Sequence, residues 1–215
     1  MPVSTRFKEM RTRLKELRRH LLPAKFSPTG EYSDRQLDRA RGYRLLVHAE
    51  IESYLEDVAR EAATKAIQEW SNNKKPSTIL LSFLASYHSG WDTNDERTND
   101  EIIKLAKSRT RIKDSVNEAI NIAQRQYINY IKENHGVKEK NLKQLILPLG
   151  IEINELDETW VTNLDNFGSI RGEIAHKTKR ATTQINPEDE YNTVRTLLIG
   201  LKELDEKIMR AQSFL

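Results

Sequence analysis

The sequence predicts an all-α fold, and three observations carry this prediction. Ala, Leu, Ile, Glu, Lys and Arg dominate the 215 residues, while Pro contributes 6 and Gly 8, a composition typical of helical proteins. Apolar residues recur at steps of three and four over several long stretches, which is the period of an amphipathic helix. Capping signals precede two of these stretches. The length is sufficient for one domain with a substantial hydrophobic core.

The composition excludes several classes of protein. The chain has no Cys, which excludes a disulfide framework, a thiolate nucleophile and a cysteine metal site. No apolar run approaches the roughly 18–20 residues of a membrane span. The first twenty residues are charged and periodic, unlike a secretory signal. We therefore expect a cytoplasmic protein with no membrane partner.

Positive charge is concentrated in two places, although the net charge is only +3. Residues 1–25 hold eight Lys or Arg against Glu9 and Glu16. The second cluster surrounds the end of a predicted helix and consists of Arg171, Lys177, Lys179 and Arg180. Basic clusters attract polyphosphates. For the N-terminal cluster, a helix surface kept soluble by Lys and Arg explains the charge equally well.

The N-terminal stretch predicts a helix with a narrow apolar seam, which Pro23, Pro28 and Gly30 end. Such a seam packs against one partner helix, in this chain or in a second copy. We expect residues 1–32 to form a basic N-terminal helix and linker, and residues 33–215 to form the main domain. The seam residues are Val3, Phe7, Met10, Leu14, Leu17 and Leu21.

A capping box at Ser33 predicts the start of a long helix that runs to about Trp70. Within it, Arg44, His48 and Glu52 are spaced at intervals of four residues and form one polar row. Such a row is typical of a salt-bridged surface, and the alternative is a row that lines a polar cleft. The spacing leaves both interpretations open.

The middle of the chain predicts shorter helices joined by loops. A buried helix covers residues 78–87, and a polar loop bearing Trp91 covers residues 89–99. A longer helix begins at Asn99 or Asp100 and ends at Asn134-His135-Gly136, with a break near Ser108 left open. A short helix follows over residues 141–147.

Two helices complete the prediction. The first covers about residues 156–177, with an apolar stripe at helical spacing. The second begins at Asn186-Pro187, where an N-cap, a proline at the first helical position and three acids coincide. The stripe of the first helix consists of Leu156, Trp160, Leu164, Phe167, Ile170 and Ile174.

Arg171 and His176 lie near the end of the first of these helices. Their Cα–Cβ vectors are about 140° apart on an ideal helix, so a long guanidinium must close the gap or two copies must face each other in a dimer. Histidine moves protons near neutral pH, and arginine binds phosphate through a bidentate fork. These residue types suit RNA cleavage. Similar spacings occur at Arg13…His20 and Arg41…His48, so spacing alone also fits a solvated helix face.

Two segments together resemble the HEPN superfamily. The sequence IRGEIAHK, residues 170–177, contains its Arg-x4-His motif, and YRLLVHAEIESYLEDVA, residues 43–59, resembles the first core helix of the RiboL-PSP-HEPN branch. The resemblance covers roughly residues 36–209. It implies a HEPN-type helical bundle, here with an extra N-terminal helix, that dimerises and places both Arg/His pairs in one cleft. Many catalytic members are metal-independent endoribonucleases of toxin–antitoxin, CRISPR and anti-phage systems.

The resemblance also implies roles for individual residues. Arg171 would bind and stabilise the scissile phosphate, and His176 would act as acid or base, leaving a 2′,3′-cyclic phosphate and a 5′-hydroxyl. No cofactor or metal is expected. The family often has a polar residue after the motif arginine, where this chain has Gly172. We further expect support from His48, Glu50, Glu52 and Glu173, and RNA contacts from Lys177, Lys179, Arg180 and Arg44.

The expected partners are RNA, a second copy of the chain, and an antitoxin or defence-system protein. We expect the dimer interface to bury Phe167 or its neighbours, and one of His48, Glu50 or Glu52 to approach Arg171 or His176. The main alternative is a non-catalytic HEPN module that binds RNA, a nucleotide or a partner enzyme. A structural bundle with a coincidental Arg/His pair is a third. Glu173-x-x-His176 also resembles half of a di-metal site, but no second Glu-x-x-His exists.

Overall fold

The structure, a computed structural model, describes the backbone of residues 3–88, 112–176 and 185–212. These residues form seven α-helices and two short 3₁₀ turns, with no strand among them. The prediction of an all-α fold is therefore confirmed. The elements are α1 (Thr5–Leu21), α2 (Asp34–Asn73), α3 (Thr78–His88), α5 (Ile112–Lys132), α6 (Glu139–Ile146), η1 (Leu147–Leu149), η2 (Ile153–Glu155), α7 (Glu158–His176) and α8 (Pro187–Ala211).

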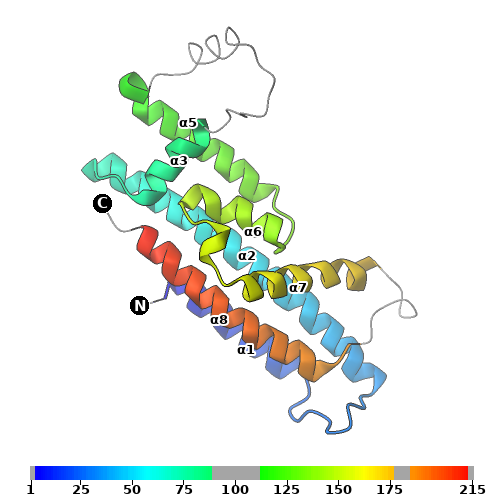
Figure 1. Cartoon of the computed structure of the whole chain (residues 1–215). Helices are drawn as coiled ribbons and strands as arrows, with labels where there is room; N and C mark the ends of the chain where they lie inside the picture. The colour runs from blue at the N-terminus through cyan, green and yellow to red at the C-terminus, as the bar shows by residue number, and fades with distance from the viewer. Residues whose placement is uncertain (1–2, 89–111, 177–184, 213–215) are drawn as a thin grey trace.

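Helix α2 is the axis of the bundle (Figure 1). Helices α1 and α8 pack beside it, α7 crosses it, and α3, α5 and α6 gather around its C-terminal half. The predicted capping box is present: the Ser33 side chain accepts from Gln36 N–H, and the Gln36 side chain accepts from Ser33 N–H. The helix continues to Asn73, slightly beyond the predicted end. The predicted loop with Trp91 and the helix start at residues 99–100 lie outside the described residues.

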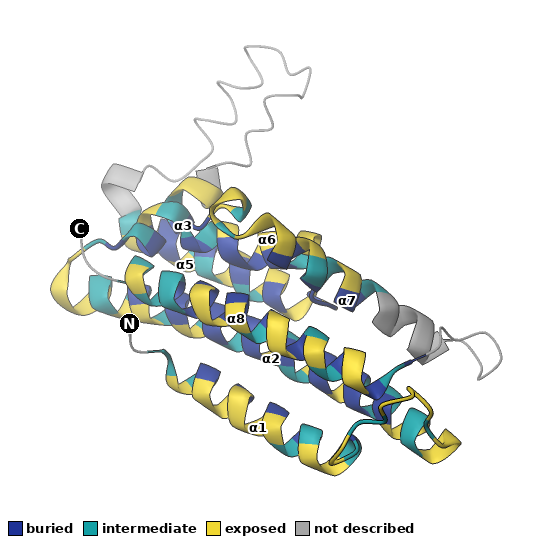
Figure 2. Cartoon of the chain, turned by 60° about the horizontal axis from the view of Figure 1, so that its bottom comes forward, coloured by how far each residue is buried: buried dark blue, intermediate teal, exposed yellow. Residues whose placement is uncertain are grey.

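Helix α1 packs into the common core of this chain. The seam residues Phe7, Met10, Leu14 and Leu17 are buried in the same cluster as the apolar residues of α2 and α8. Because α1 contacts mainly α2, the partner helix of the seam lies within the chain. Figure 2 shows the consequence: the inner side of α1 is buried, and its outer side is exposed.

Asp205 connects three helices in the interior. Its side chain is fully buried and accepts hydrogen bonds from Ser4 N–H at 2.7 Å, Ser4 Oγ at 2.6 Å and Tyr54 Oη at 2.9 Å. Three donors compensate for the cost of burying this carboxylate. Burial and the neighbouring Asp205 raise the pKa of Tyr54 well above its usual range. The start of α1 is thus fixed to both α2 and α8.

A tryptophan–glycine contact sets the distance between α7 and α8. The Trp160 indole donates to the Leu197 carbonyl at 3.0 Å and lies flat against Gly200. A Cβ atom at Gly200 would come within 2.4 Å of the Trp160 ring, so a side chain cannot be added there without moving a helix. The start of α8 is as predicted, with the Asn186 side chain accepting from Glu188 N–H at 2.8 Å.

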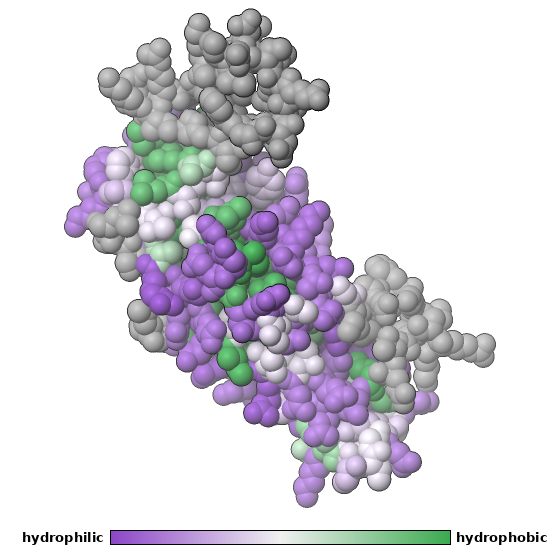
Figure 3. All heavy atoms as spheres, viewed as in Figure 1, coloured by the Kyte–Doolittle hydropathy of each residue, from purple (hydrophilic) through white to green (hydrophobic). Residues whose placement is uncertain are grey.

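Figure 3 shows one face of the molecule, where most of the surface is hydrophilic and hydrophobic side chains gather near α3 and α6. Tyr130, Leu147 and Pro148 line a depression beside α6, together with Lys140, Lys143 and other polar residues. Among the described helices, none combines the length and apolar character needed to cross a membrane.

Candidate active site on helix α7

The backbone of α7 is helical up to His176, which places Arg171 and His176 in its last two turns. The side chains of residues 170–176, including Glu173, lie outside the described part of the chain. Lys177, Lys179 and Arg180 lie outside it entirely. The residues that hold α7 in place immediately before the motif, by contrast, lie within the described part.

Phe167 is the anchor of this part of α7, one turn before Arg171. It is 1% exposed. The Arg44 guanidinium lies 4.7 Å from the centre of its ring, and the His48 ring is stacked on it at 6.0 Å with an interplanar angle of 17°. Both contacts come from α2. They fix the position of the α7 backbone at the point where the motif begins.

Arg44 connects three helices in the interior. It is 4% exposed, and its Nη1 donates to Glu190 Oε1 in the first turns of α8 at 2.6 Å. Its Nη2 donates to the Phe167 carbonyl at 3.4 Å, a long bond. The structure therefore corrects the expectation that Arg44 faces RNA, because its guanidinium is buried and bound to Glu190.

Glu190, the partner of Arg44, was not predicted from the sequence. As one of three acids after Asn186, it matched the ordinary pattern of a helix start. In the structure it is 7% exposed, and burial raises the pKa of its carboxyl while Arg44 opposes that rise. Within the described residues, Glu190 Oε2 and Arg44 Nε have no hydrogen-bond partner, so the ion pair is incompletely satisfied.

The polar row on α2 does not form an open surface. Arg44 and His48 are buried beneath α7, and His48 Nδ1 lies 3.4 Å from Glu52 Oε2. Glu52 is partly exposed at the edge of this row. The expected approach of His48 or Glu52 to Arg171 or His176 involves side chains outside the described ones, so it stays a prediction.

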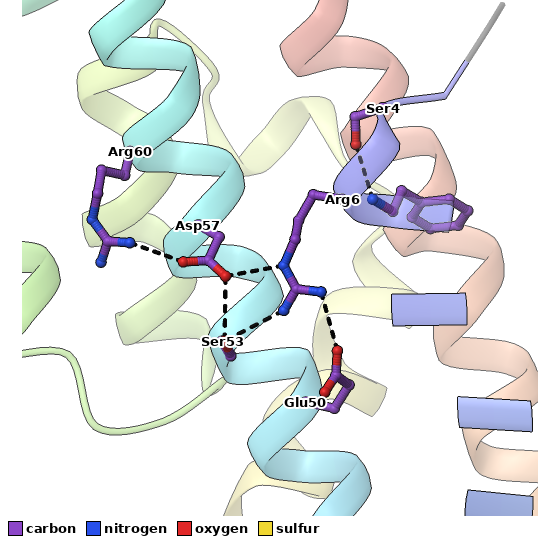
Figure 4. Close-up of polar contacts among 7 residues, drawn as sticks. Ser4, Arg6, Glu50, Ser53, Asp57 and Arg60 are labelled. Carbon is purple, nitrogen blue, oxygen red and sulfur yellow. Dashed lines mark hydrogen bonds and ion pairs between the residues drawn. The ribbon is translucent and has the colours of Figure 1, made fainter. Parts of the chain in front are cut away.

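Glu50 lies on α2 beside Arg6 of α1 (Figure 4). It accepts from Arg6 Nη1 of α1 at 3.1 Å, and the same guanidinium donates from Nε to Asp57 at 3.0 Å. Asp57 also binds Arg60 at 2.8 Å. The Glu50 carboxylate is thus used in the contact between α1 and α2, and the expectation that it supports the motif stays a prediction.

Phe167 itself is buried within its own chain, so the expected dimer interface cannot include its ring, while the expected burial of its neighbours in a dimer stays a prediction. Its ring is covered by Arg44 and His48 of its own chain, so a second copy cannot be what buries it. The exposed positions on this part of the bundle are elsewhere, for example Asn166 on α7 and Ile199 on α8, which is 65% exposed.

Comparison with known proteins places these features in a family. The family model described as RiboL-PSP-HEPN matches residues 8–210, which confirms the resemblance found in the sequence. No curated protein and no solved structure matches the chain. The match spans α1 as well as the two helices that carry the polar row and the Arg/His motif. The chain therefore belongs to the RiboL-PSP-HEPN family, whose HEPN domain indicates a nuclease or RNA-binding role.

Proposed function

We propose that this protein is a metal-independent endoribonuclease whose site forms between two copies of the chain. One observation carries the proposal: in a HEPN-family chain, Arg171 and His176 share the last turns of α7, directly after a residue held by buried contacts from α2. The backbone of a helix that carries catalytic side chains must be held in place to within about 0.5 Å. The contacts that Phe167 makes with Arg44 and His48 support the proposal, because they hold α7 in place one turn before Arg171.

The proposed reaction needs one proton acceptor, one proton donor and a phosphate ligand. The ribose 2′-hydroxyl loses its proton and attacks phosphorus, the bond to the 5′-oxygen breaks, and that oxygen gains a proton. His176 serves one of these proton transfers in each chain. Arg171 binds the non-bridging oxygens and stabilises the charge that develops on them. The products are a 2′,3′-cyclic phosphate and a 5′-hydroxyl.

Two copies supply a complete site because the pair on one helix diverges. Arg171 and His176 point about 140° apart on an ideal helix, so two facing α7 helices bring four functional groups around one phosphate. In this arrangement Lys177, Lys179 and Arg180 contact the flanking RNA, and Glu173, His48 and Glu52 support the histidine. The proposed biological context is phage defence or a toxin–antitoxin system with a partner protein.

The test is cleavage of labelled RNA by the purified full chain, with and without EDTA. We expect EDTA to have no effect. His176→Ala should lower the rate by about 10²–10⁴ because a positioned acid–base group is lost, while RNA binding is retained. His135→Ala is the matched control, since His135 is exposed in the loop after α5. Arg171→Ala should lower both binding and cleavage, with the exposed Arg125→Ala as its control.

The outcomes separate the alternatives. If His176→Ala cleaves as fast as the wild type, the histidine is structural and the mechanism is wrong. If the wild type binds RNA without cleaving it, the protein is a non-catalytic HEPN module, in line with Gly172 in place of the family's usual polar residue. Sedimentation at micromolar concentration tests the dimer, and a monomer that cleaves RNA would contradict the composite site.

A further inference from the structure

The basic residues of α1 fall into two groups with different surroundings. Arg6 binds Glu50 and Asp57, Arg13 binds Glu16 at 3.1 Å, and the Arg18 guanidinium lies over both the Phe26 and the Tyr191 rings. These three have structural partners. The second group is exposed and forms no ion pair with the described residues; it consists of Lys8, Arg11, Lys15 and Arg19.

The four residues of the second group share one face of the helix, which we call the α1 basic row. At 100° per residue they fall within an arc of about 80°, and at 1.5 Å per residue they span about 16 Å. The acids of α1, Glu9 and Glu16, lie to one side of the row, and Glu16 is already paired with Arg13. The α1 basic row is therefore an uncompensated line of positive charge on the exposed side of α1 (Figure 2).

The row is suited to a polyanion rather than to a lipid surface. A helix that lies in a membrane interface needs an exposed apolar face beside its basic residues. The large apolar residues of α1 face the core, and the exposed positions of Thr5–Leu21 are all polar or charged. Evenly spaced charges, one for each turn of helix, complement a backbone of evenly spaced phosphates.

One end of the α1 basic row lies close to the elements that hold α7. Arg18, the neighbour of Arg19, stacks on Tyr191 of α8 at 5.0 Å. Tyr191 follows Glu190, which binds Arg44 beneath Phe167. An RNA strand that follows α1 toward its C-terminal end therefore reaches the end of the bundle where α8 begins. There Glu190 binds Arg44, and Arg44 contacts Phe167 of α7.

We propose that the α1 basic row is an accessory RNA-binding surface, separate from the cleavage site, which holds the phosphate backbone of a bound strand outside that site. The identity of the polyanion as RNA rests on the proposed function. Because binding can be measured without cleavage, the two proposals can fail independently.

The test is binding of a fluorescein-labelled single-stranded 20-mer RNA by fluorescence anisotropy, over a series of salt concentrations. All proteins carry His176→Ala so that the RNA stays intact. The row variant replaces Lys8, Arg11, Lys15 and Arg19 with Gln. Its matched control removes the same charge from other exposed positions, by Gln substitution of Lys65, Lys132, Lys140 and Lys143. Circular dichroism establishes that each variant is folded.

Each lost phosphate contact lowers the slope of log K against log salt by about 0.7 for a single strand. The row variant should therefore show a slope reduced by as much as about 3, and an affinity about tenfold or more weaker at 0.1 M salt. The control should keep the slope and affinity of the parent. Parent-like binding by the row variant overturns the proposal, and so does an equal loss in the control, which would show an effect of net charge alone.

Two further measurements distinguish RNA binding by the α1 basic row from membrane binding and from the proposed nuclease activity. Vesicles containing phosphatidylserine are offered in competition with the RNA, and preferential binding to the vesicles through the row would overturn the assignment to RNA. Cleavage is measured separately, with the row substitutions in the wild-type background. If the wild type binds RNA through the row without cleaving it, the nuclease proposal fails and the row stands. If the row variant binds and cleaves as the wild type does, only the row proposal fails.

Discussion

The two halves of α2 bury different kinds of side chain. In the half that contacts α7 and the start of α8, the buried residues include Arg44 and His48. In the other half, beside α3 and α5, the buried positions are apolar and mostly small. They are Leu55, Val58, Ala59, Ala62, Ala63 and Ala66.

The two halves of this continuous helix therefore place different demands on the elements packed against them. Alanine side chains let neighbouring helices approach closely and make no demand for hydrogen bonds. A buried arginine needs both a counter-charge and acceptors, and here they come from Glu190 and the Phe167 carbonyl. Because this ion pair lies beneath Phe167, four residues before the Arg/His motif, we predict that it positions α7.

The largest expected effect comes from Arg44→Met. This change leaves the Glu190 carboxylate buried without a counter-charge, which costs about 3–5 kcal/mol of unfolding free energy. Urea denaturation measures the loss. Adding Glu190→Leu to the same chain should recover most of it, because both charges are then gone. RNA cleavage per folded molecule should fall in both variants, and unchanged cleavage would show that the anchor does not position α7.

The half of α2 beside α3 and α5 should respond to size instead of charge. Ala62 is fully buried, so Ala62→Leu forces extra volume into a filled space and should cost about 1–3 kcal/mol. Cleavage per folded molecule should remain at the wild-type level. Its neighbour Glu61 is exposed, and Glu61→Leu should change the unfolding free energy by no more than about 0.5 kcal/mol. Loss of cleavage in Ala62→Leu would remove the distinction between the two halves.

Arg60, an arginine on the surface of the same helix, provides a comparison for the buried Arg44. Arg60 binds Asp57 at 2.8 Å with both side chains more than a third exposed. Such pairs contribute about 0–1 kcal/mol, so Arg60→Met should cost far less than Arg44→Met in the same urea experiment. A comparable cost for the two variants would mean that the burial of Arg44 has no energetic consequence.

The smallest expected effect is a pH dependence. Burial raises the pKa of Glu190 above its ordinary value of 4.5, so the stability that this carboxyl contributes is present below the unfolded pKa and lost as pH rises through the folded pKa. Glutamine does not titrate. The unfolding free energy of the wild type relative to Glu190→Gln should therefore decrease as the pH rises above 4.5, the ordinary pKa of this carboxyl. A difference that grows over this range would show that Arg44 dominates over burial.

The features that depend on residues close together in the sequence could be predicted from the sequence alone. The capping signals at Ser33 and Asn186, the seam of α1 and the helical stripe through Phe167 were all predicted, since each is a pattern along the chain. The family was predictable for the same reason, because its motif is a short ordered string. These patterns specify local structure and leave open what packs against it.

The pair of Arg44 and Glu190 could not be predicted, because it joins residues 146 positions apart. A row of polar residues at intervals of four looks the same on a surface and in an interior, and only the packing of α7 distinguishes them. Glu50 is a second residue whose partner could not be predicted from the sequence. It lies within the segment that resembles the family, yet its partner is Arg6 of the N-terminal helix.

The position of Asp205 has a consequence for how the chain is made. Its carboxylate binds Ser4 across 201 positions of sequence, so the first helix emerges from the ribosome long before its anchor exists. Until α8 has been synthesised, the apolar seam of α1 lacks the contact that fixes its N-terminal end. The contact that joins the start of α1 to α8 can therefore form only after α8 has been synthesised as far as Asp205, 201 positions after Ser4.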